Sequence, residues 1–248
     1  MNKNEAQTGS LPDPHVGPHV GPLGERGLLF TFAPQQEHAV PLPVSLSVQQ
    51  RVWALSAWLE ERRQELRLRE IVPGMGNLLV VADYFTSDHA SLADTVLSLW
   101  PTLRPLPGSG RTVEIPVHYG SGRGEDGDDD GPDLALVAAH TGLSVAEIIR
   151  RHSEATYQVY CLGFQPGFAY LAGLDPSLAT PRRASPRVRT PAGSVAIGGN
   201  QTGIYPSSGP GGWQIIGRTS LVLFDPNRDS PSLLQPGDSV RFVPGGSS

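Results

Sequence analysis

The sequence predicts an α+β protein in which a ferredoxin-like βαββαβ unit is followed by an all-β domain. Two patterns support this prediction. In the first half, short apolar runs alternate with segments whose apolar residues recur every three or four positions. From residue 157 onward, short apolar runs are separated by turns rich in glycine and proline, and helical periodicity is absent. The 248 residues suffice for one large domain or two modest ones, each with its own core.

The N-terminal domain is expected to span residues 23–110. It follows a polar, proline- and glycine-rich segment, residues 1–22, that is predicted to be a disordered tail. Ser87 is a suitable N-cap for the second helix. The last strand of the βαββαβ order falls just past the domain boundary. The expected elements are a strand at 27–32, a helix at 48–68, strands at 70–72 and 78–81, a helix at 87–99 and a strand at 112–117.

The second domain is expected to span residues 111–244 and to include two short helices within 132–152. Pro132 is a good first-turn residue, and Ser144 with Glu147 three positions later forms a capping box. Many short strands joined by tight turns favour a small barrel or sandwich. The expected strands are 157–162, 194–198, 202–205, 213–217, 221–224 and 239–243.

Composition excludes several classes of function. The formal net charge of −5 argues against wholesale nucleic-acid binding, and no apolar run is long enough for a membrane span. The N-terminus lacks the apolar core of a signal peptide, so a cytoplasmic location is expected. The single cysteine excludes an internal disulfide and a multi-cysteine metal site. The acidic loop 119–131 matches half of a calcium loop, but Val137 stands at the twelfth position, so no metal site is predicted.

An arginine-rich segment at 176–191 is the first candidate site. Prolines stiffen it, and four arginines within eight residues repel one another unless an anion or an acidic partner lies nearby. The segment is therefore an anion-binding surface, a solvated loop, or a loop paired with the acidic residues at 125–130.

Glycine loops, amides and aromatic side chains supply the remaining candidates. The glycines permit close backbone approach to a ligand, or they simply form barrel turns. His152 falls on an apolar helical face, where it is either a hydrogen-bonded core residue or a general acid/base, and it is the catalytic candidate. The predicted substrate- or anion-binding residues are Arg182, Arg183, Arg187, Arg189, Ser194, Asn200, Gln201, Tyr205 and Arg218. The predicted pocket wall, which could equally be core packing, comprises Phe164, Gly167, Phe168, Tyr170 and Trp213.

An ordered set of motifs then resembles a known family. The runs are HSEATYQVYCLGFQPGFAYLAGLD, PRRASPRVRTPAGSVAIGGNQTGIYP, GPGGWQIIGRT, LFDP and LLQPGDSVRFVP. They are similar to the KipI/PxpB family, described as the B subunit of bacterial 5-oxoprolinase, allophanate hydrolase subunit 1, or carboxyltransferase domain, subdomain C/D. The resemblance covers about residues 23–244 and is strongest from 132 onward. The acidic loop 123–130, Gln165 and the segment 1–22 depart from the family pattern.

The resemblance implies an N-terminal α/β domain and a C-terminal cyclophilin-like β-barrel. It also implies a non-autonomous part of an ATP-dependent 5-oxoprolinase, which opens 5-oxo-L-proline to L-glutamate with two partners, a PxpA-like protein and a larger KipA/PxpC-like protein. Two alternatives remain open. One is the carboxyltransferase part of a biotin-dependent urea carboxylase, although no biotin attachment sequence occurs here. The other is a regulatory protein that inhibits a sensor histidine kinase.

A lactam is a poor electrophile, and ATP can activate it by phosphorylating the amide oxygen. Arginines would then hold the carboxylate and phosphate groups, while Asn200 and Gln201 could pair with the lactam N–H and C=O. The chain has no GxxxxGK[ST] loop and no GxGxxG preceding a helix. ATP is therefore expected to be shared with a partner subunit, with no bound cofactor in the isolated chain.

Overall fold

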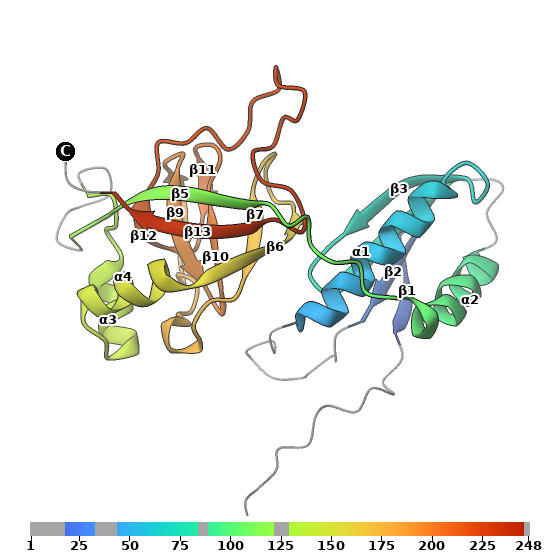
Figure 1. Ribbon diagram of the computed structural model, residues 1–248, viewed down its shortest axis with the longest axis horizontal. Coiled ribbons are helices and arrows are strands. Elements are labelled where there is room, and N and C mark those ends of the chain that lie inside the picture. Colours follow the sequence, from blue (N-terminus) through green and yellow to red (C-terminus); the bar gives the residue numbers. More distant parts are fainter. Residues whose placement is uncertain (1–17, 33–43, 84–88, 122–128, 246–248) are drawn as a thin grey trace, which may run out of the picture.

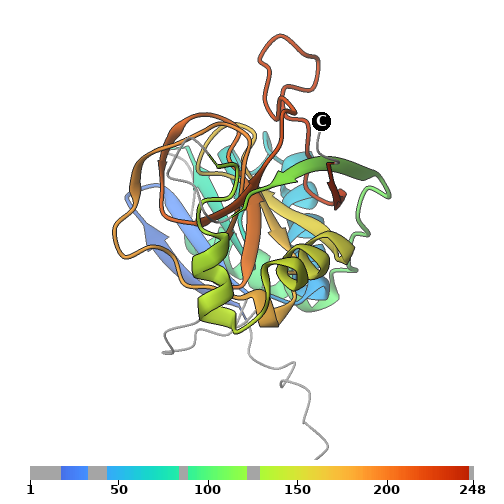
Figure 2. The same ribbon diagram turned by 90° about the vertical axis from the view of Figure 1, so that its left-hand side faces the viewer.

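The computed structural model describes residues 18–32, 44–83, 89–121 and 129–245. An N-terminal α/β domain and a β-barrel domain lie side by side, and an extended linker runs between them (Figure 1). Figure 2 views the molecule from the barrel side, with helices α3 and α4 packed beneath the barrel. In the part of the chain that is described, no helix has the length and apolar character needed to span a membrane.

The N-terminal domain is a four-stranded antiparallel sheet, ordered β1-β2-β4-β3, with two helices. In β4, every second residue is buried, as expected for a half-buried strand. Helix α1 buries Val52, Leu55 and Leu59 in the core of this domain, against the buried face of the sheet. Ser45 caps the first turn of the helix. The elements are β1 His19–Leu23, β2 Gly27–Thr31, α1 Leu46–Glu61, β3 Leu68–Pro73, β4 Asn77–Ala82 and α2 His89–Leu99, followed by the short helix η1 Trp100–Thr102.

This domain does not adopt the predicted ferredoxin-like order of strands and helices. Four of the five residues of strand β1 lie in the segment expected to be a disordered tail, and β1 forms the edge of the sheet, where proline is tolerated. The strand expected to close the domain, β5 Thr112–Tyr119, belongs instead to the barrel. An alternating pattern predicts a strand but does not say which sheet it joins, and this ambiguity accounts for the difference. Ser87, the expected helix cap, lies outside the described residues.

The second domain is a closed barrel with strand order β10-β7-β6-β13-β5-β12-β9, which confirms the small barrel expected from the sequence. Strands β5 and β13 pair in parallel, and the other pairs are antiparallel. No strand forms at 221–224, where only Phe224 makes an isolated bridge with Ser232. The bounds are β6 Thr156–Leu162, β7 Ala169–Ala172, β9 Ser194–Gly198, β10 Gln201–Ile204, β12 Gln214–Arg218 and β13 Ser239–Pro244, with the short helix η2 Pro176–Leu178. A separate pair, β8 Arg187–Thr190 and β11 Gly209–Gly211, lies outside the barrel sheet.

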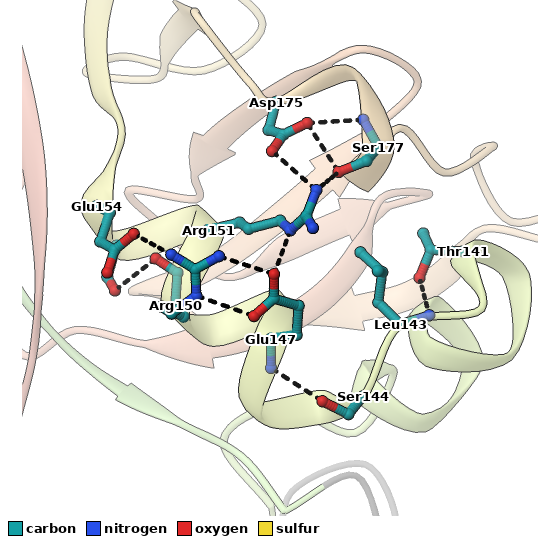
Figure 3. A network of polar contacts seen from close by, with 10 residues as sticks. Thr141, Leu143, Ser144, Glu147, Arg150, Arg151, Glu154, Asp175 and Ser177 are labelled. Carbon is teal, nitrogen blue, oxygen red and sulfur yellow. Dashed lines mark hydrogen bonds and ion pairs between the residues drawn. The ribbon is translucent and has the colours of Figure 1, made fainter.

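Helices α3 Leu134–Thr141 and α4 Val145–Glu154 cover one end of the barrel. Ser144 accepts from the Glu147 backbone N–H, which is one half of the predicted capping box; the Glu147 carboxylate bonds arginines and not the Ser144 N–H. Glu147 then pairs with Arg150 and Arg151, and Arg151 also contacts Asp175 before η2 (Figure 3). These exposed pairs contribute little stability individually, but they tie α4 to the chain that leads toward the arginine segment.

Buried polar contacts join the two domains. The Trp53 indole N–H donates to the Tyr160 carbonyl oxygen at 2.9 Å. The Gln49 amide also donates to that oxygen at 3.1 Å, while its own oxygen accepts from the Gly76 N–H at 2.9 Å. Each backbone group at this contact therefore has a partner, as burial requires.

Candidate functional site

Asp133, just before helix α3, is the anchor of the arginine segment. Its side chain is 5% exposed, and its carboxylate accepts from both terminal nitrogens of Arg187, at 2.8 and 2.9 Å. Arg183 donates to the same carboxylate at 3.1 Å, and the Ile215 backbone N–H donates at 2.7 Å. A buried carboxylate with a bidentate arginine and two further donors is well stabilised.

This arrangement gives two of the four clustered arginines, Arg183 and Arg187, an acidic partner within the protein. The Arg187 side chain is only 7% exposed. It lines a small gap of about 20 Å³ together with Ser194 and Arg218, and it is not among the residues that line the pocket formed by Phe168, Tyr205 and Trp213. The counter-charge that Arg187 needs comes from Asp133. The acidic partners expected at 125–130 lie mostly outside the described residues.

Arg182 differs from its neighbours. It is exposed, and among the described residues it has no hydrogen bond or ion pair. Its guanidinium carbon lies 5.6 Å from the centre of the Trp213 ring, which is a cation–π distance. Arg182 is therefore the cation of this segment that is best placed to receive an anion from outside the chain.

Beside Arg182 is an aromatic pocket of about 270 Å³. The rings of Phe168 and Trp213 meet edge-on with centroids 5.6 Å apart, and Phe168 meets Tyr205 at 5.4 Å. Burial raises the pKa of the Tyr170 and Tyr205 hydroxyls, so both stay protonated at neutral pH. The lining residues are Phe164, Phe168, Tyr170, Arg182, Arg183, Pro186, Tyr205, Pro210, Gly211, Gly212 and Trp213.

Glycines allow this cluster to pack against the barrel backbone. A Cβ on Gly198 would lie 2.4 Å from the Trp213 ring, and one on Gly211 would lie 2.7 Å from the Tyr205 hydroxyl oxygen. The sequence predicts close backbone approach at such glycines, but the approaching groups that the structure shows are the protein's own aromatic rings.

Phe164 stands at the mouth of the aromatic pocket. It is 60% exposed and has a φ of +62°, which is uncommon for a residue with a side chain. The turn is held by hydrogen bonds from the Gln165 N–H to the Gly163 oxygen and from the Phe168 N–H to the Gln165 oxygen. Gly167 is expected from the sequence in the pocket wall, but it does not line the pocket. It is a buried residue of this turn, with a φ of +82°. An exposed aromatic in a strained turn beside a pocket is typical of a ligand- or partner-contacting position.

The other predicted ligand residues are dispersed. Gln201 donates to the sulfur of Met75 in the N-terminal domain, and Asn200 precedes it at the β9–β10 turn. Arg189 bonds Ser208, and Arg218 bonds the Ala192 oxygen at 3.2 Å. None of these four residues lines the aromatic pocket.

His152 is wholly buried in the barrel core. One ring nitrogen lies 2.7 Å from the Tyr119 hydroxyl oxygen, the other lies 2.9 Å from the Thr202 hydroxyl oxygen, and the ring stacks on Phe242. Burial lowers the pKa of His152 to about 3, so the ring is neutral. The structure does not support the prediction that His152 is catalytic. Both ring nitrogens are hydrogen-bonded to hydroxyl groups, and His152 lines neither of the two hollows beside Arg182.

A second hollow, of about 420 Å³, lies on the other side of Arg182. Helix α3 contributes Leu136 and His140, and the segment 180–185 with Gln214 forms the opposite wall. Neither Asp133 nor Gln214 stands out in the sequence. The only available signal for Asp133 is an acid directly after Pro132, at a helix start. Among the residues that the structure describes, no cluster of three metal-ligating side chains occurs.

The fold and these hollows define a two-domain protein whose β-barrel domain carries two hollows flanked by Arg182. The family model described as carboxyltransferase domain, subdomain C and D, matches residues 18–234, so the chain belongs to that family.

The chain is similar to proteins named as the B subunit of 5-oxoprolinase. It is 50% identical to the one from Escherichia coli O157:H7 over 222 residues, which are 90% of this chain and 94% of that protein. It is 46% identical to the one from Haemophilus influenzae, over 86% of this chain and 97% of that protein. Similarity to a putative urea carboxylase of Emericella nidulans is distant, at 33% over 91 residues, which are 36% of this chain and 7% of that protein.

Solved structures agree with the fold. The crystal structure of TTHA0988 is 37% identical with a TM-score of 0.70, covering 90% of this chain. This chain spans 40% of that longer protein. The Kluyveromyces lactis urea amidolyase, 22% identical with a TM-score of 0.72 over 92% of this chain and 15% of that one, shares the fold.

We predict that Arg187→Ala destabilises the protein by roughly 3–5 kcal/mol, because it leaves a buried carboxylate without its bidentate partner. Urea unfolding measures this effect. Arg189→Ala is the matched control, since its exposed side chain bonds only Ser208 among the described residues, and a change within about 0.5 kcal/mol is expected. Equal stability of the two variants would contradict the structural role of Arg187.

We predict that His152 makes the fold sensitive to acid. Its pKa is about 3 in the fold and about 6.5 in the unfolded chain, so its contribution is complete above pH 6.5 and falls as the pH drops toward 3. The loss approaches about 1.4 kcal/mol per pH unit. Unfolding of the wild type and His152→Gln should be compared at pH 7, 6, 5 and 4. The stability gap should narrow with acid, whereas a constant gap would show that His152 does not titrate on unfolding.

Proposed function

We propose that this chain is the B subunit of an ATP-dependent 5-oxoprolinase, which opens 5-oxo-L-proline to L-glutamate together with PxpA-like and PxpC-like partners. The observation that carries the proposal is the 50% identity to the 5-oxoprolinase B subunit of Escherichia coli O157:H7 over 94% of that protein. We place the complex in the cytoplasm, where ATP is available.

Arg182 supports this proposal chemically. The substrate carries a carboxylate, and Arg182 is an exposed guanidinium without an ion pair among the described residues. Hollows on both sides of it provide space for a small ring and for an activating group. The aromatic pocket would exclude water and so strengthen a charge-assisted hydrogen bond to Arg182.

The chain contributes binding groups rather than a complete catalytic apparatus. His152 is buried and neutral, and the sequence has no phosphate loop with a following lysine. We therefore propose that ATP is shared with a partner subunit. The γ-phosphoryl group would pass from ATP to the lactam oxygen with release of ADP; water would then attack the activated carbonyl carbon, and loss of phosphate and cleavage of the C–N bond would give glutamate.

Reconstitution tests the function. Purified chain mixed with its PxpA-like and PxpC-like partners should release ADP and glutamate only when 5-oxoproline is present. Omitting this chain should abolish turnover, and the chain alone should be inactive. Full activity of the two partners without it would overturn the proposal, as would robust turnover by the chain alone.

Arg182→Ala should weaken use of 5-oxoproline by roughly 10- to 150-fold in the reconstituted complex, the loss expected for one charge-assisted contact. Arg228→Ala is the control, because Arg228 pairs with Asp225 on an exposed loop. Melting temperatures of both variants should match the wild type. Unchanged kinetics for Arg182→Ala would remove Arg182 from the substrate site.

A further inference from the structure

Two buried polar atoms in the wall of the hollow beside helix α3 lack hydrogen-bond partners. They are the Arg183 Nε donor and the Gln214 Oε1 acceptor, and no other side-chain nitrogen or oxygen in the described parts of the chain is buried and unpaired in this way. Leaving such groups unpaired is costly, so native proteins rarely keep them without a reason. Gln214 is 3% exposed, and both residues line the hollow.

The surrounding hydrogen bonds show that these two atoms belong to neighbouring segments of the chain. The Arg183 backbone N–H donates to the Gly212 oxygen at 2.7 Å, and the Gln214 amide N–H donates to the Pro181 oxygen at 2.8 Å. Residues 181–183 therefore run alongside residues 212–214. The Gln214 amide is also oriented by this bond, because flipping it would set its oxygen against the Pro181 oxygen.

An unpaired donor and an unpaired acceptor on neighbouring segments are together complementary to an amide group. A lactam holds its N–H and C=O on the same edge, so it can donate to Gln214 Oε1 and accept from Arg183 Nε. Arg182 lines the same hollow and can receive a carboxylate. Leu136 and Pro181 supply apolar surface for the ring carbons.

Resting on the proposed function, we propose that Gln214 and Arg183 recognise the lactam edge of 5-oxoproline in the hollow between helix α3 and residues 180–185. The lactam N–H donates to Gln214, and Arg183 donates to the lactam oxygen. Both protein atoms are shielded from solvent, so binding requires a side-chain rotation or a shift of the exposed segment 181–185. Asn200 and Gln201, the amides expected from the sequence to do this, lie elsewhere.

The test measures selectivity for the lactam N–H in the reconstituted complex. The substrates are 5-oxoproline and its N-methyl derivative, which keeps the ring and the carboxylate but cannot donate to Gln214. The wild type should prefer 5-oxoproline in kcat/KM by roughly 5- to 150-fold, and Gln214→Leu should lose most of this preference. Gln235→Leu is the matched control, since the Gln235 side chain bonds only Ser230 and Ser232 among the described residues.

A second variant keeps the proposal testable if Gln214→Leu does not fold. Leu136→Trp fills the hollow from the exposed face of α3 without altering Gln214, and it should raise KM while the melting temperature stays near that of the wild type. If Gln214→Leu keeps the selectivity of the wild type and Leu136→Trp keeps its KM, the proposed lactam site is wrong. Turnover of 5-oxoproline by the wild-type complex would in that case still support the proposed function. Absence of 5-oxoproline turnover by the wild-type complex would overturn both.

Discussion

The buried carboxylate of Asp133 is the interaction on which the site depends. It binds Arg183, Arg187 and the backbone of β12 at once, and so it fastens the arginine segment to the barrel at the start of helix α3. Removing such a charge from water is favourable only with several good donors, and it has four here. Because Arg183 and Arg187 are held in this way, the neighbouring Arg182 projects between two hollows, with no ion pair to any described residue.

The aromatic cluster supplies the second constraint. Trp213 and Phe168 fit against the barrel only because Gly198 and Gly203 carry no side chain. The rings then form an apolar wall beside the exposed Arg182 guanidinium, which lies in cation–π contact with Trp213. The strained, exposed Phe164 lies at the edge of this wall, so surface that could meet a ligand or a partner adjoins the rigid core.

Local signals in the sequence are sufficient for several elements. The Ser144 cap, the apolar face of α4 and the short apolar runs that form the barrel strands follow from short-range rules of spacing and capping. Pairing partners are not predictable in this way. The pattern of β5 is compatible with either sheet, and β1 is too rich in glycine and proline to stand out as a strand.

The same limit applies to the site. The arginines and aromatics are recognisable by type, and the structure brings Arg182, Tyr205, Phe164 and Trp213 together. The sequence cannot say which arginine is neutralised, because Asp133 lies 50 positions before Arg183 and reaches it only through the fold. His152 is similarly ambiguous, since a polar residue on an apolar helical face fits both a core hydrogen bond and a catalyst.

A double-mutant cycle tests the central claim most directly, namely that Asp133 holds Arg187 and leaves Arg182 available. Unfolding free energies of Asp133→Ala, Arg187→Ala and the double variant should give a coupling energy of roughly 2–3 kcal/mol. The corresponding cycle of Asp133 with Arg182 should give a coupling within about 0.5 kcal/mol. Equal coupling in the two cycles would contradict the account, because Arg182 would then be as much a partner of Asp133 as Arg187 is.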